Sequence, residues 1–333
     1  MIDVLCLGEI LVDWICSTKG LELDEAEHFT KAAGGAPANT AIGLARQNIN
    51  VAFIGRVSDD GFGKWLLNIL NSHHIDTTAT ISDASAKTRM AYVVTTLNGD
   101  RKLAEFSRIA CADTKLSIED LCIDHFYQAS ILHFGSISLI ASPASETTKK
   151  AVELAKENNM LISYDPNIRL PLWESPEKCK QTILNTLHWG DIVKINEDEL
   201  LFLTGSKDLI NADRLRQEYN ICLLIITLDA RGAYITTIMG SKVIEGFDIK
   251  LVEATGAGDG FNSGVLSGIL EHVKNSADRR KKLEQLDLSE LTRIITRANA
   301  IGAITCTRAG AMTALPQINE IEEFIKNQTC LDL

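Results

Sequence analysis

A glycine-rich stretch at residues 252–264, VEATGAGDGFNSG, constrains the fold more than any other part of the chain. The residues before it read as the end of a strand or a turn, and those after it place Phe261, Val265 and Ile269 on one face at helical spacing. The triplet at 256–258 therefore lies where a loop becomes a helix N-terminus. Small residues there let backbone N–H groups face outward, and the helix dipole adds positive potential, so the triplet suits an anion.

Asp259 directly follows the triplet and has two interpretations. A carboxylate has no use in a cradle that only binds an anion, but it could take the proton from a hydroxyl that attacks the bound anion. That chemistry is phosphoryl transfer. The alternative is a glycine-rich turn in which Asp259 is an ordinary residue of a helix N-terminus. Short motifs also match by chance, so this stretch alone leaves both interpretations open.

Short apolar runs alternate with helical patterns, which predicts an α/β fold with a mostly parallel sheet buried on both faces. Polar residues follow several of these runs, and open α/β sheets bind ligands at the carboxyl ends of their strands. Asp13, beyond the first run, could accept hydrogen bonds from sugar hydroxyls or could be a turn residue. The predicted strands are 2–7, 51–55, 131–134, 161–164, 191–195 and 222–228.

The stretch KAAGGAPANTAIGLARQ at residues 31–47 carries a second signal. Gly34 and Gly35 allow a ligand to approach the backbone closely, and Pro37 suits the first turn of a helix. Asn39 would then project from that first turn, beside the paired glycines.

Asn196 and Glu199 share one face of a predicted helix start because they are three residues apart. An amide and a carboxylate at this place could hold the water shell of Mg²⁺ beside phosphates. The alternative is a capping interaction within the helix, which the residues alone favour.

A hairpin is predicted outside the main sheet. Two apolar strands, 91–97 and 101–106, flank a turn at Asn98-Gly99-Asp100. We expect a single domain over residues 1–333, with a lid formed by about 11–32 and 88–110.

Composition excludes several classes of protein. The net charge of −11 disfavours a nucleic-acid partner, since nothing would offset phosphate repulsion. No apolar stretch approaches the ~20 residues of a membrane span, and the N-terminus lacks the positive start of a signal peptide. Eight cysteines without a CxxC pair indicate buried free thiols in a reducing compartment, so we expect a cytoplasmic protein.

Taken together, these stretches resemble the ribokinase-like (PfkB) carbohydrate kinases over nearly the whole chain. GGAPANTAIGLARQ and ATGAGDGF match the family's two glycine-rich signatures, and VKINEDEL matches its Asn-x-x-Glu element. DPNIRLPLW, FSRIACAD and ANAIGAITCTRAGA are most similar to the fructokinase and 2-keto-3-deoxygluconate kinase branches. The resemblance implies a three-layer αβα sandwich with a small β lid, through which two copies could pair.

The implied activity is transfer of the γ-phosphoryl group of ATP to a primary hydroxyl of a small sugar. Ala112-Asp113 favours fructose, giving fructose 6-phosphate, because a carboxylate beside the site would repel an acidic acceptor. The alternatives are 2-keto-3-deoxygluconate, another acceptor of the family, and a non-catalytic sensor of sugar or nucleotide.

The resemblance also implies a role for each matching residue. Asp259 would be the catalytic base, with Gly256, Ala257 and Gly258 as the anion hole. Glu199 would hold Mg²⁺ through water. Further implied residues are Asp13, Gly34, Gly35, Asn39 and Arg108 at the sugar, Arg169 near the moving phosphoryl group, and Asn196, Thr227, Gly232 and Asn299 at the nucleotide.

Glu253 departs from the family pattern. The family usually has Asp there and uses it with Thr255 to bind a monovalent cation such as K⁺. Since Glu is one methylene longer, we expect only a weak dependence on potassium.

Overall fold

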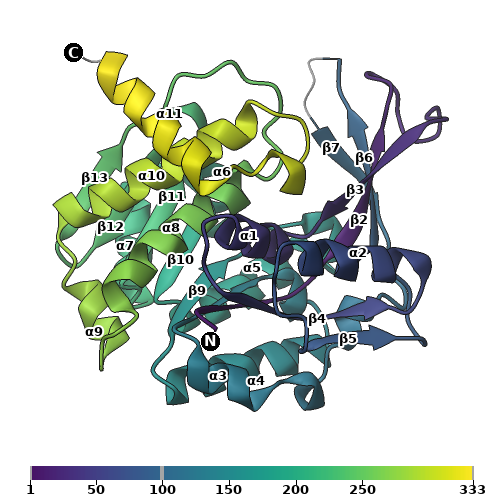
Figure 1. Cartoon of the computed structure of the whole chain (residues 1–333), viewed down its shortest axis with the longest axis horizontal. Helices are drawn as coiled ribbons and strands as arrows, with labels where there is room; N and C mark the ends of the chain where they lie inside the picture. The colour runs from purple at the N-terminus through teal and green to yellow at the C-terminus, as the bar shows by residue number, and fades with distance from the viewer. Residues whose placement is uncertain (1, 98–100, 332–333) are drawn as a thin grey trace.

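The computed structural model describes residues 2–97 and 101–331, and within them nine strands form one large sheet (Figure 1). Six neighbouring pairs, from β11 across to β5, are parallel, while β12 and β13 extend the sheet in antiparallel fashion. In spatial order the strands are β13 (Gly240–Ile244), β12 (Ala233–Thr237), β11 (Leu223–Thr227), β10 (Ile192–Asn196), β9 (Leu161–Asp165), β8 (Ile131–Gly135), β1 (Val4–Leu7), β4 (Val51–Ser58) and β5 (Thr80–Asp83).

Helices cover both faces of this sheet. Side chains alternate along each strand, so Val4 and Cys6 of β1 enter one core while Leu5 and Leu7 enter the other. The first core is covered by α1 (Ala36–Ala45), α2 (Gly61–Ser72), α8 (Ala257–Val273), α9 (Arg279–Glu284) and α10 (Leu288–Cys306), with α11 (Ile318–Leu331) packed on α10. The second is covered by α3 (Ile123–Gln128), α4 (Ala144–Glu157), α5 (Pro176–Thr186), α6 (Glu197–Thr204) and α7 (Ile210–Glu218).

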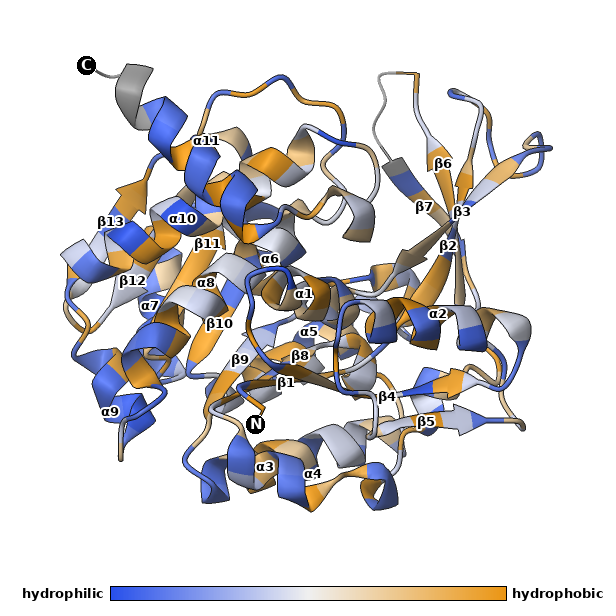
Figure 2. Cartoon of the chain, in the orientation of Figure 1, coloured by the Kyte–Doolittle hydropathy of each residue, from blue (hydrophilic) through white to orange (hydrophobic). Residues whose placement is uncertain are grey.

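The predicted three-layer sandwich is therefore confirmed. Figure 2 shows apolar colour concentrated in the central strands and hydrophilic colour on the outer helices such as α9.

Helix α8 is buried on nearly all sides, between α1 and α10, rather than on a single apolar face. Glycines make this close packing possible. A Cβ on Gly264 would lie 2.8 Å from the Cα of Ala298 in α10, and a Cβ on Gly43 of α1 would lie 2.6 Å from Ser263 Oγ. The packing fixes the N-terminus of α8 at the carboxyl ends of the parallel strands.

The predicted smaller sheet is also confirmed. It lies apart from the main sheet at the upper right of Figure 1, with strand order β3-β2-β6-β7. Its strands are β3 (Phe29–Gly34), β2 (Leu11–Cys16), β6 (Met90–Thr95) and β7 (Arg101–Phe106). The turn predicted at 98–100 lies outside the described residues.

Two expectations from composition can be compared with the structure. No helix in the described ranges is long and apolar enough to span a bilayer. The seven cysteines whose side chains are described are free thiols, five of them buried. The cytoplasmic location stays a prediction.

Candidate active site

The glycine-rich loop forms the N-terminus of α8 as predicted. Gly256 is its N-cap residue with φ of +80°, and a Cβ there would lie 2.9 Å from the Cα of Ala311, so only glycine fits. The N–H of Ala257 donates to the Ala254 carbonyl at 3.2 Å, and the first bond within the helix runs from Gly260 N–H to the Gly256 carbonyl.

The amides of Gly258 and Asp259 are left without a partner inside the helix. No side chain caps this helix within the described part of the chain. Its first turn therefore offers two N–H donors to an anion.

Asp259 lies at this helix start with its side chain buried and only 7% of the residue exposed. Asn39, from the first half of α1, donates a hydrogen bond from Nδ2 to Asp259 Oδ2 at 2.7 Å. Burial raises the pKa of Asp259 to about 6, although the bond from Asn39 opposes this rise. A carboxylate with a pKa near the working pH is well matched to general-base chemistry.

Asn39 also presents an acceptor. Its Oδ1 is buried and has no hydrogen-bond partner among the described residues. Buried acceptors without partners are rare in native proteins, so this oxygen suits a donor supplied by a substrate hydroxyl.

The paired glycines bring Asp13 to the same place. A Cβ on Gly34 would lie 2.2 Å from Asp13 Oδ2, so the carboxylate rests directly against the Gly34 backbone. Gly35 has φ of +108°, and its Cβ would lie 2.4 Å from the carbonyl oxygen of Glu9. These contacts explain the glycine pair that the sequence singled out.

A buried ion pair lies beneath the loop, and the sequence interpretation missed it. Lys194 Nζ contacts Asp165 Oδ2 at 2.7 Å, and Asn262 Nδ2 donates to the same oxygen at 2.8 Å. A Cβ on Gly258 would lie 3.1 Å from Lys194 Nζ, so the ammonium group packs against the anion cradle. Burial alone would lower the pKa of Lys194, but the Asp165 and Glu199 carboxylates outweigh it and raise that pKa. The sequence signal for this ion pair was a lysine inside an otherwise apolar strand.

Asn196 and Glu199 form a reciprocal capping box at the start of α6. Asn196 Oδ1 accepts from Glu199 N–H at 2.8 Å, and Glu199 Oε2 accepts from Asn196 N–H at 2.9 Å. The other carboxylate oxygen, Oε1, accepts from Ile168 N–H at 2.7 Å. The capping interpretation thus describes the structure, and backbone groups occupy both Glu199 oxygens.

This geometry bears on a magnesium ion. Within residues 2–97 and 101–331 no group of three or more His, Cys, Asp or Glu side chains could hold a metal. The residues present fit an ion that is held mainly by phosphates and water, which is the usual state of nucleotide-bound Mg²⁺. Direct binding of a metal by Glu199 does not fit.

The predicted nucleotide residues fall into two pairs. Asn196 and Thr227 are neighbours in register at the carboxyl ends of β10 and β11. Gly232, with φ of +94°, packs against the end of β13, because its Cβ would lie 2.1 Å from the Ile244 carbonyl oxygen. Asn299 donates to the carbonyls of Ile244 and Glu245 at 3.2 and 2.9 Å. Gly232 and Asn299 therefore both contact the end of β13, the strand at the edge of the main sheet.

The two predicted arginines are exposed. Arg169 follows β9 and lies close enough to Asp259 for its charge to lower the pKa of that carboxyl. Arg108 lies just beyond the end of β7. Glu253, in the loop that also carries Thr255, accepts from Gly310 N–H at 3.0 Å.

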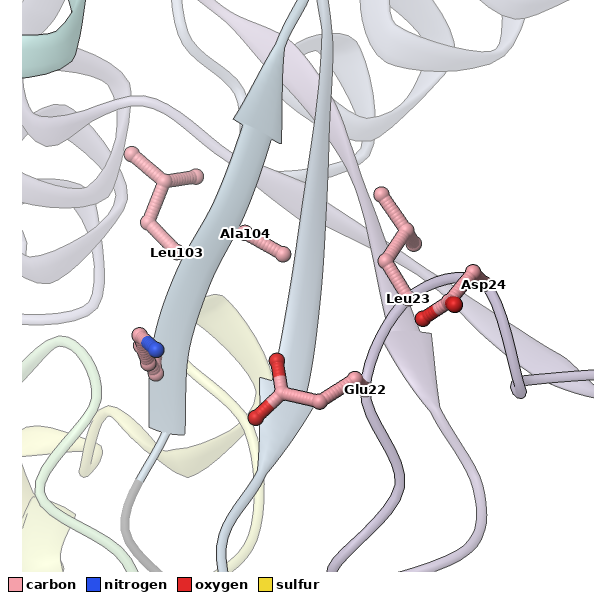
Figure 3. Close-up of a pocket in the computed structure, with 6 residues that line it drawn as sticks. Glu22, Leu23, Asp24, Leu103 and Ala104 are labelled. Atoms are coloured by element: carbon pink, nitrogen blue, oxygen red, sulfur yellow. The ribbon is translucent and has the colours of Figure 1, made fainter.

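A separate cleft of about 460 Å³ lies at the outer end of the small sheet (Figure 3). It is open and is lined by Glu22, Leu23, Asp24, Lys102, Leu103 and Ala104. None of the predicted site residues lines it, so it is distinct from the site around Asp259.

The chain is similar to known proteins over nearly its whole length. Residues 1–318 match the model of the pfkB family carbohydrate kinases. The chain is 37% identical over 327 residues to a probable fructokinase-7 of Arabidopsis thaliana, covering 97% of this chain and 92% of the relative.

Two solved structures are similar over almost their full length. A fructokinase of Xylella fastidiosa with bound ATP has a TM-score of 0.88 and 27% identity, with 98% of this chain and 99% of that chain covered. A fructokinase double mutant of Vibrio cholerae O395, in fructose-, ADP- and potassium-bound form, has a TM-score of 0.83 and 30% identity, with coverage of 97% and 98%.

Proposed function

Because the chain belongs to the PfkB family of carbohydrate kinases, we propose that it transfers the γ-phosphoryl group of ATP to the primary hydroxyl of fructose, giving fructose 6-phosphate. The observation that carries the proposal is the buried pair of Asn39 and Asp259 at the uncapped start of α8. In this proposal Asp259 acts as the base beside backbone N–H groups that can stabilise negative charge.

Each part of the site has a task in this reaction. Asp259 takes the proton of the attacking hydroxyl, while the free amides of Gly258 and Asp259 stabilise charge on the moving phosphoryl group. Arg169 adds positive charge nearby. Phosphoryl transfer depends mainly on positioning and electrostatics, and fixing the two reactants in line can supply about 7–11 kcal/mol.

The acceptor is held by neutral and charged groups of both signs. Asp13 accepts hydrogen bonds from sugar hydroxyls, Asn39 Oδ1 accepts another, and the Gly34-Gly35 backbone allows close approach. Arg108 completes the acceptor site from the end of β7. The fructokinase relatives support a neutral sugar over the acidic 2-keto-3-deoxygluconate, whereas Arg89 compensates the charge of the buried Asp113 carboxylate.

Cations enter with the substrates. Glu199 and Asn196 would hold the water shell of an ATP-bound Mg²⁺, since backbone groups already occupy the Glu199 oxygens. When bound, the ion neutralises charge on the phosphates. A monovalent cation would lie at Glu253 and Thr255.

The small sheet serves as the lid of this site and as a contact between two copies of the chain. Its edge strands β3 and β7 support the pairing, because unpaired strand edges are available for association. Light scattering of the purified protein would test this pairing, and a monomer at all concentrations would contradict it.

A coupled assay of ADP release over fructose, 2-keto-3-deoxygluconate, ribose and adenosine tests the function. We expect kcat/KM to be highest for fructose. Preference for another sugar would overturn the fructose assignment and leave the kinase assignment in place. Binding of sugar and ATP without any turnover would instead support the sensor alternative.

A further inference from the structure

The loop that carries Arg108 is fixed at both ends by backbone contacts. Ser107 N–H donates to the Met90 carbonyl at 2.8 Å at one end. At the other end Lys87 N–H donates to the Ala110 carbonyl at 2.8 Å, and Ala110 has φ of +56°. The loop therefore leaves and rejoins the segment just before β6.

Arg89 lies inside this arrangement with only 3% of the residue exposed. Its Nε donates to Asp113 Oδ2 at 2.8 Å, and its NH1 donates to the Ser107 carbonyl at 2.8 Å. One planar guanidinium thus joins the residues before and after the loop. The Arg89 carbonyl also accepts from Val12 N–H at 3.0 Å, which ties this point to β2.

Glu9 is a further buried acidic residue beside the paired glycines. It is buried at 3% exposure, and its Oε1 accepts from the N–H of Ala36, the residue after Gly35, at 3.0 Å. Asp113 and Arg89 are close enough to act on Glu9 with opposite signs, and burial raises the pKa of Glu9 to about 7. The geometric link between Arg89 and the glycine pair runs through β2, because Val12 bonds to the Arg89 carbonyl and Leu11 is in register with Gly34 of β3.

We propose that Arg89 is a positioning residue for the sugar acceptor, holding the loop of Arg108 through Ser107 and Asp113 and tying it, through Val12 of β2, to the strand pair that carries Gly34. This inference rests on the proposed function, because Arg108 and the glycines are taken to contact the sugar. Arg89 itself is buried, with Asp113 and Ser107 as its partners, and we assign it no contact with the reacting atoms.

The substitution Arg89→Lys separates geometry from charge. Lysine keeps the positive charge beside Asp113 but lacks the planar fork that reaches Ser107 and Asp113 together. We expect KM for the sugar to rise about tenfold, the size of one lost hydrogen bond to a charged group. KM for ATP should change by less than about twofold, because the nucleotide residues lie on other strands.

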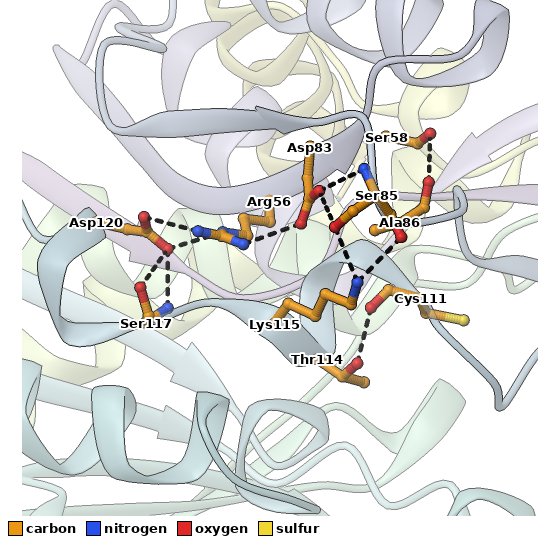
Figure 4. Close-up of polar contacts among 10 residues, drawn as sticks. All are labelled: Arg56, Ser58, Asp83, Ser85, Ala86, Cys111, Thr114, Lys115, Ser117 and Asp120. Atoms are coloured by element: carbon orange, nitrogen blue, oxygen red, sulfur yellow. Dashed lines mark hydrogen bonds and ion pairs between the residues drawn. The ribbon is translucent and has the colours of Figure 1, made fainter.

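Arg56 provides a matched control (Figure 4). It pairs with Asp120 through Nε at 2.8 Å and with Asp83 through NH1 at 2.9 Å, and these bonds do not involve the Arg108 loop. Arg56→Lys should lower the melting temperature about as much as Arg89→Lys and leave both KM values unchanged. An equal rise of the sugar KM in both variants would make the effect one of general stability and overturn the proposal.

A double-mutant cycle with Arg108→Gln tests whether Arg89 acts through the loop. If it does, Arg89→Lys has little further effect on the sugar KM once Arg108 is replaced, because coupled residues are not additive. Additive effects, or no effect of Arg108→Gln alone, would overturn the proposal. Should Arg89→Lys fail to fold, the double variant R89M/D113N removes both buried charges and gives the same KM comparison.

The kcat/KM values of the wild-type protein for the four candidate acceptors are measured first. A sugar other than fructose would contradict the fructose assignment only, and the Arg89 comparison would then use the preferred sugar. An unchanged KM for that sugar in Arg89→Lys would contradict the positioning role while leaving the function in place.

Discussion

The side chain of Asn39 donates a 2.7 Å hydrogen bond to Asp259, joining the first half of α1 to the first turn of α8 across 220 residues of sequence. The bond places the proposed base where the two glycine-rich segments meet. We therefore expect Asp259→Asn to bind fructose and ATP but to lose turnover by at least ~10²–10⁴-fold, the range of general-base catalysis. Steady-state kinetics with calorimetric binding checks this, and a variant that keeps a tenth of wild-type kcat would exclude Asp259 as the base.

The same substitution should stabilise the fold at neutral pH. The pKa of Asp259 is about 6 in the folded protein against an ordinary 3.8, so the folded state binds this proton more tightly than the unfolded state. Stability therefore falls as pH rises from about 4 to 6, and the ionised carboxylate costs about 3 kcal/mol above that range. Asparagine removes this cost.

Thermal unfolding of wild type and Asp259→Asn should give a melting temperature that is higher for the variant at pH 7.5. The difference should shrink toward pH 4.5, where the wild-type carboxyl is protonated. A variant less stable than wild type at pH 7.5 would contradict the unfavourable burial of this charge.

The pH profile of kcat/KM should report the same group. Below about pH 6 the base is protonated, so kcat/KM should fall about tenfold per pH unit. Asn39→Ala removes a donor that favours the ionised form, so the acid limb should move to higher pH.

Gln47→Ala is the control for the Asn39 variant. Gln47, just beyond the end of α1, also bonds to α8, but through Ser263 and Ser267, one and two turns after Asp259. Its loss should destabilise the protein without moving the acid limb. If the acid limb of the kcat/KM profile moved equally in both variants, the loss of activity at low pH would reflect unfolding.

Local signals carried most of the fold prediction. The apolar runs at 131–134 and 161–164 became β8 and β9 within one residue, since strands buried on both faces have continuous apolar sequence. The glycine triplet became the start of α8 for a similarly local reason. β5 (Thr80–Asp83) was missed because this edge strand has no such run.

The sequence patterns could not predict contacts between residues that are far apart in the chain. Lys194, Asp165 and Asn262 are separated by 29 and 97 residues, and only the folded sheet brings them under the loop. The spacing of Phe261, Val265 and Ile269 did not predict that α8 is buried on its other faces too, where glycines at 260, 264 and 268 allow close packing. The motifs predicted which types of residue form the site, but the contacts between these residues depend on tertiary packing.

Gly34→Ala should weaken sugar binding specifically. A methyl group at Gly34 would lie 2.2 Å from Asp13 Oδ2 and must displace the carboxylate that we assign to the sugar. We expect the sugar KM to rise about tenfold or more, equivalent to a lost charge-assisted hydrogen bond. KM for ATP should stay near its wild-type value.

Gly61→Ala is the matched glycine control. Among residues 2–97 and 101–331, and apart from its own neighbours and helix backbone, no atom lies within 4 Å of the position its methyl group would take, at the start of α2. This variant should keep both KM values. If Gly34→Ala behaved in the same way, Asp13 would have no part in sugar binding.

The last prediction concerns potassium and Glu253. Oε2 of Glu253 accepts a 3.0 Å hydrogen bond from Gly310 N–H, which ties the loop before α8 to the loop after α10. We expect wild-type kcat/KM in potassium and in sodium to agree within about twofold, since the longer side chain crowds the position of the ion.

Glu253→Asp shortens the side chain by one methylene and restores the residue type usual in the family. The variant should gain a preference for potassium over sodium, and it should lose stability by about 0.5–1.5 kcal/mol as the bond to Gly310 weakens. Glu271→Asp, an exposed residue of α8, controls for the substitution itself and should change neither quantity. A strong, saturable activation of the wild type by potassium would show that the site accepts glutamate, and the weak dependence predicted from Glu253 would then be wrong.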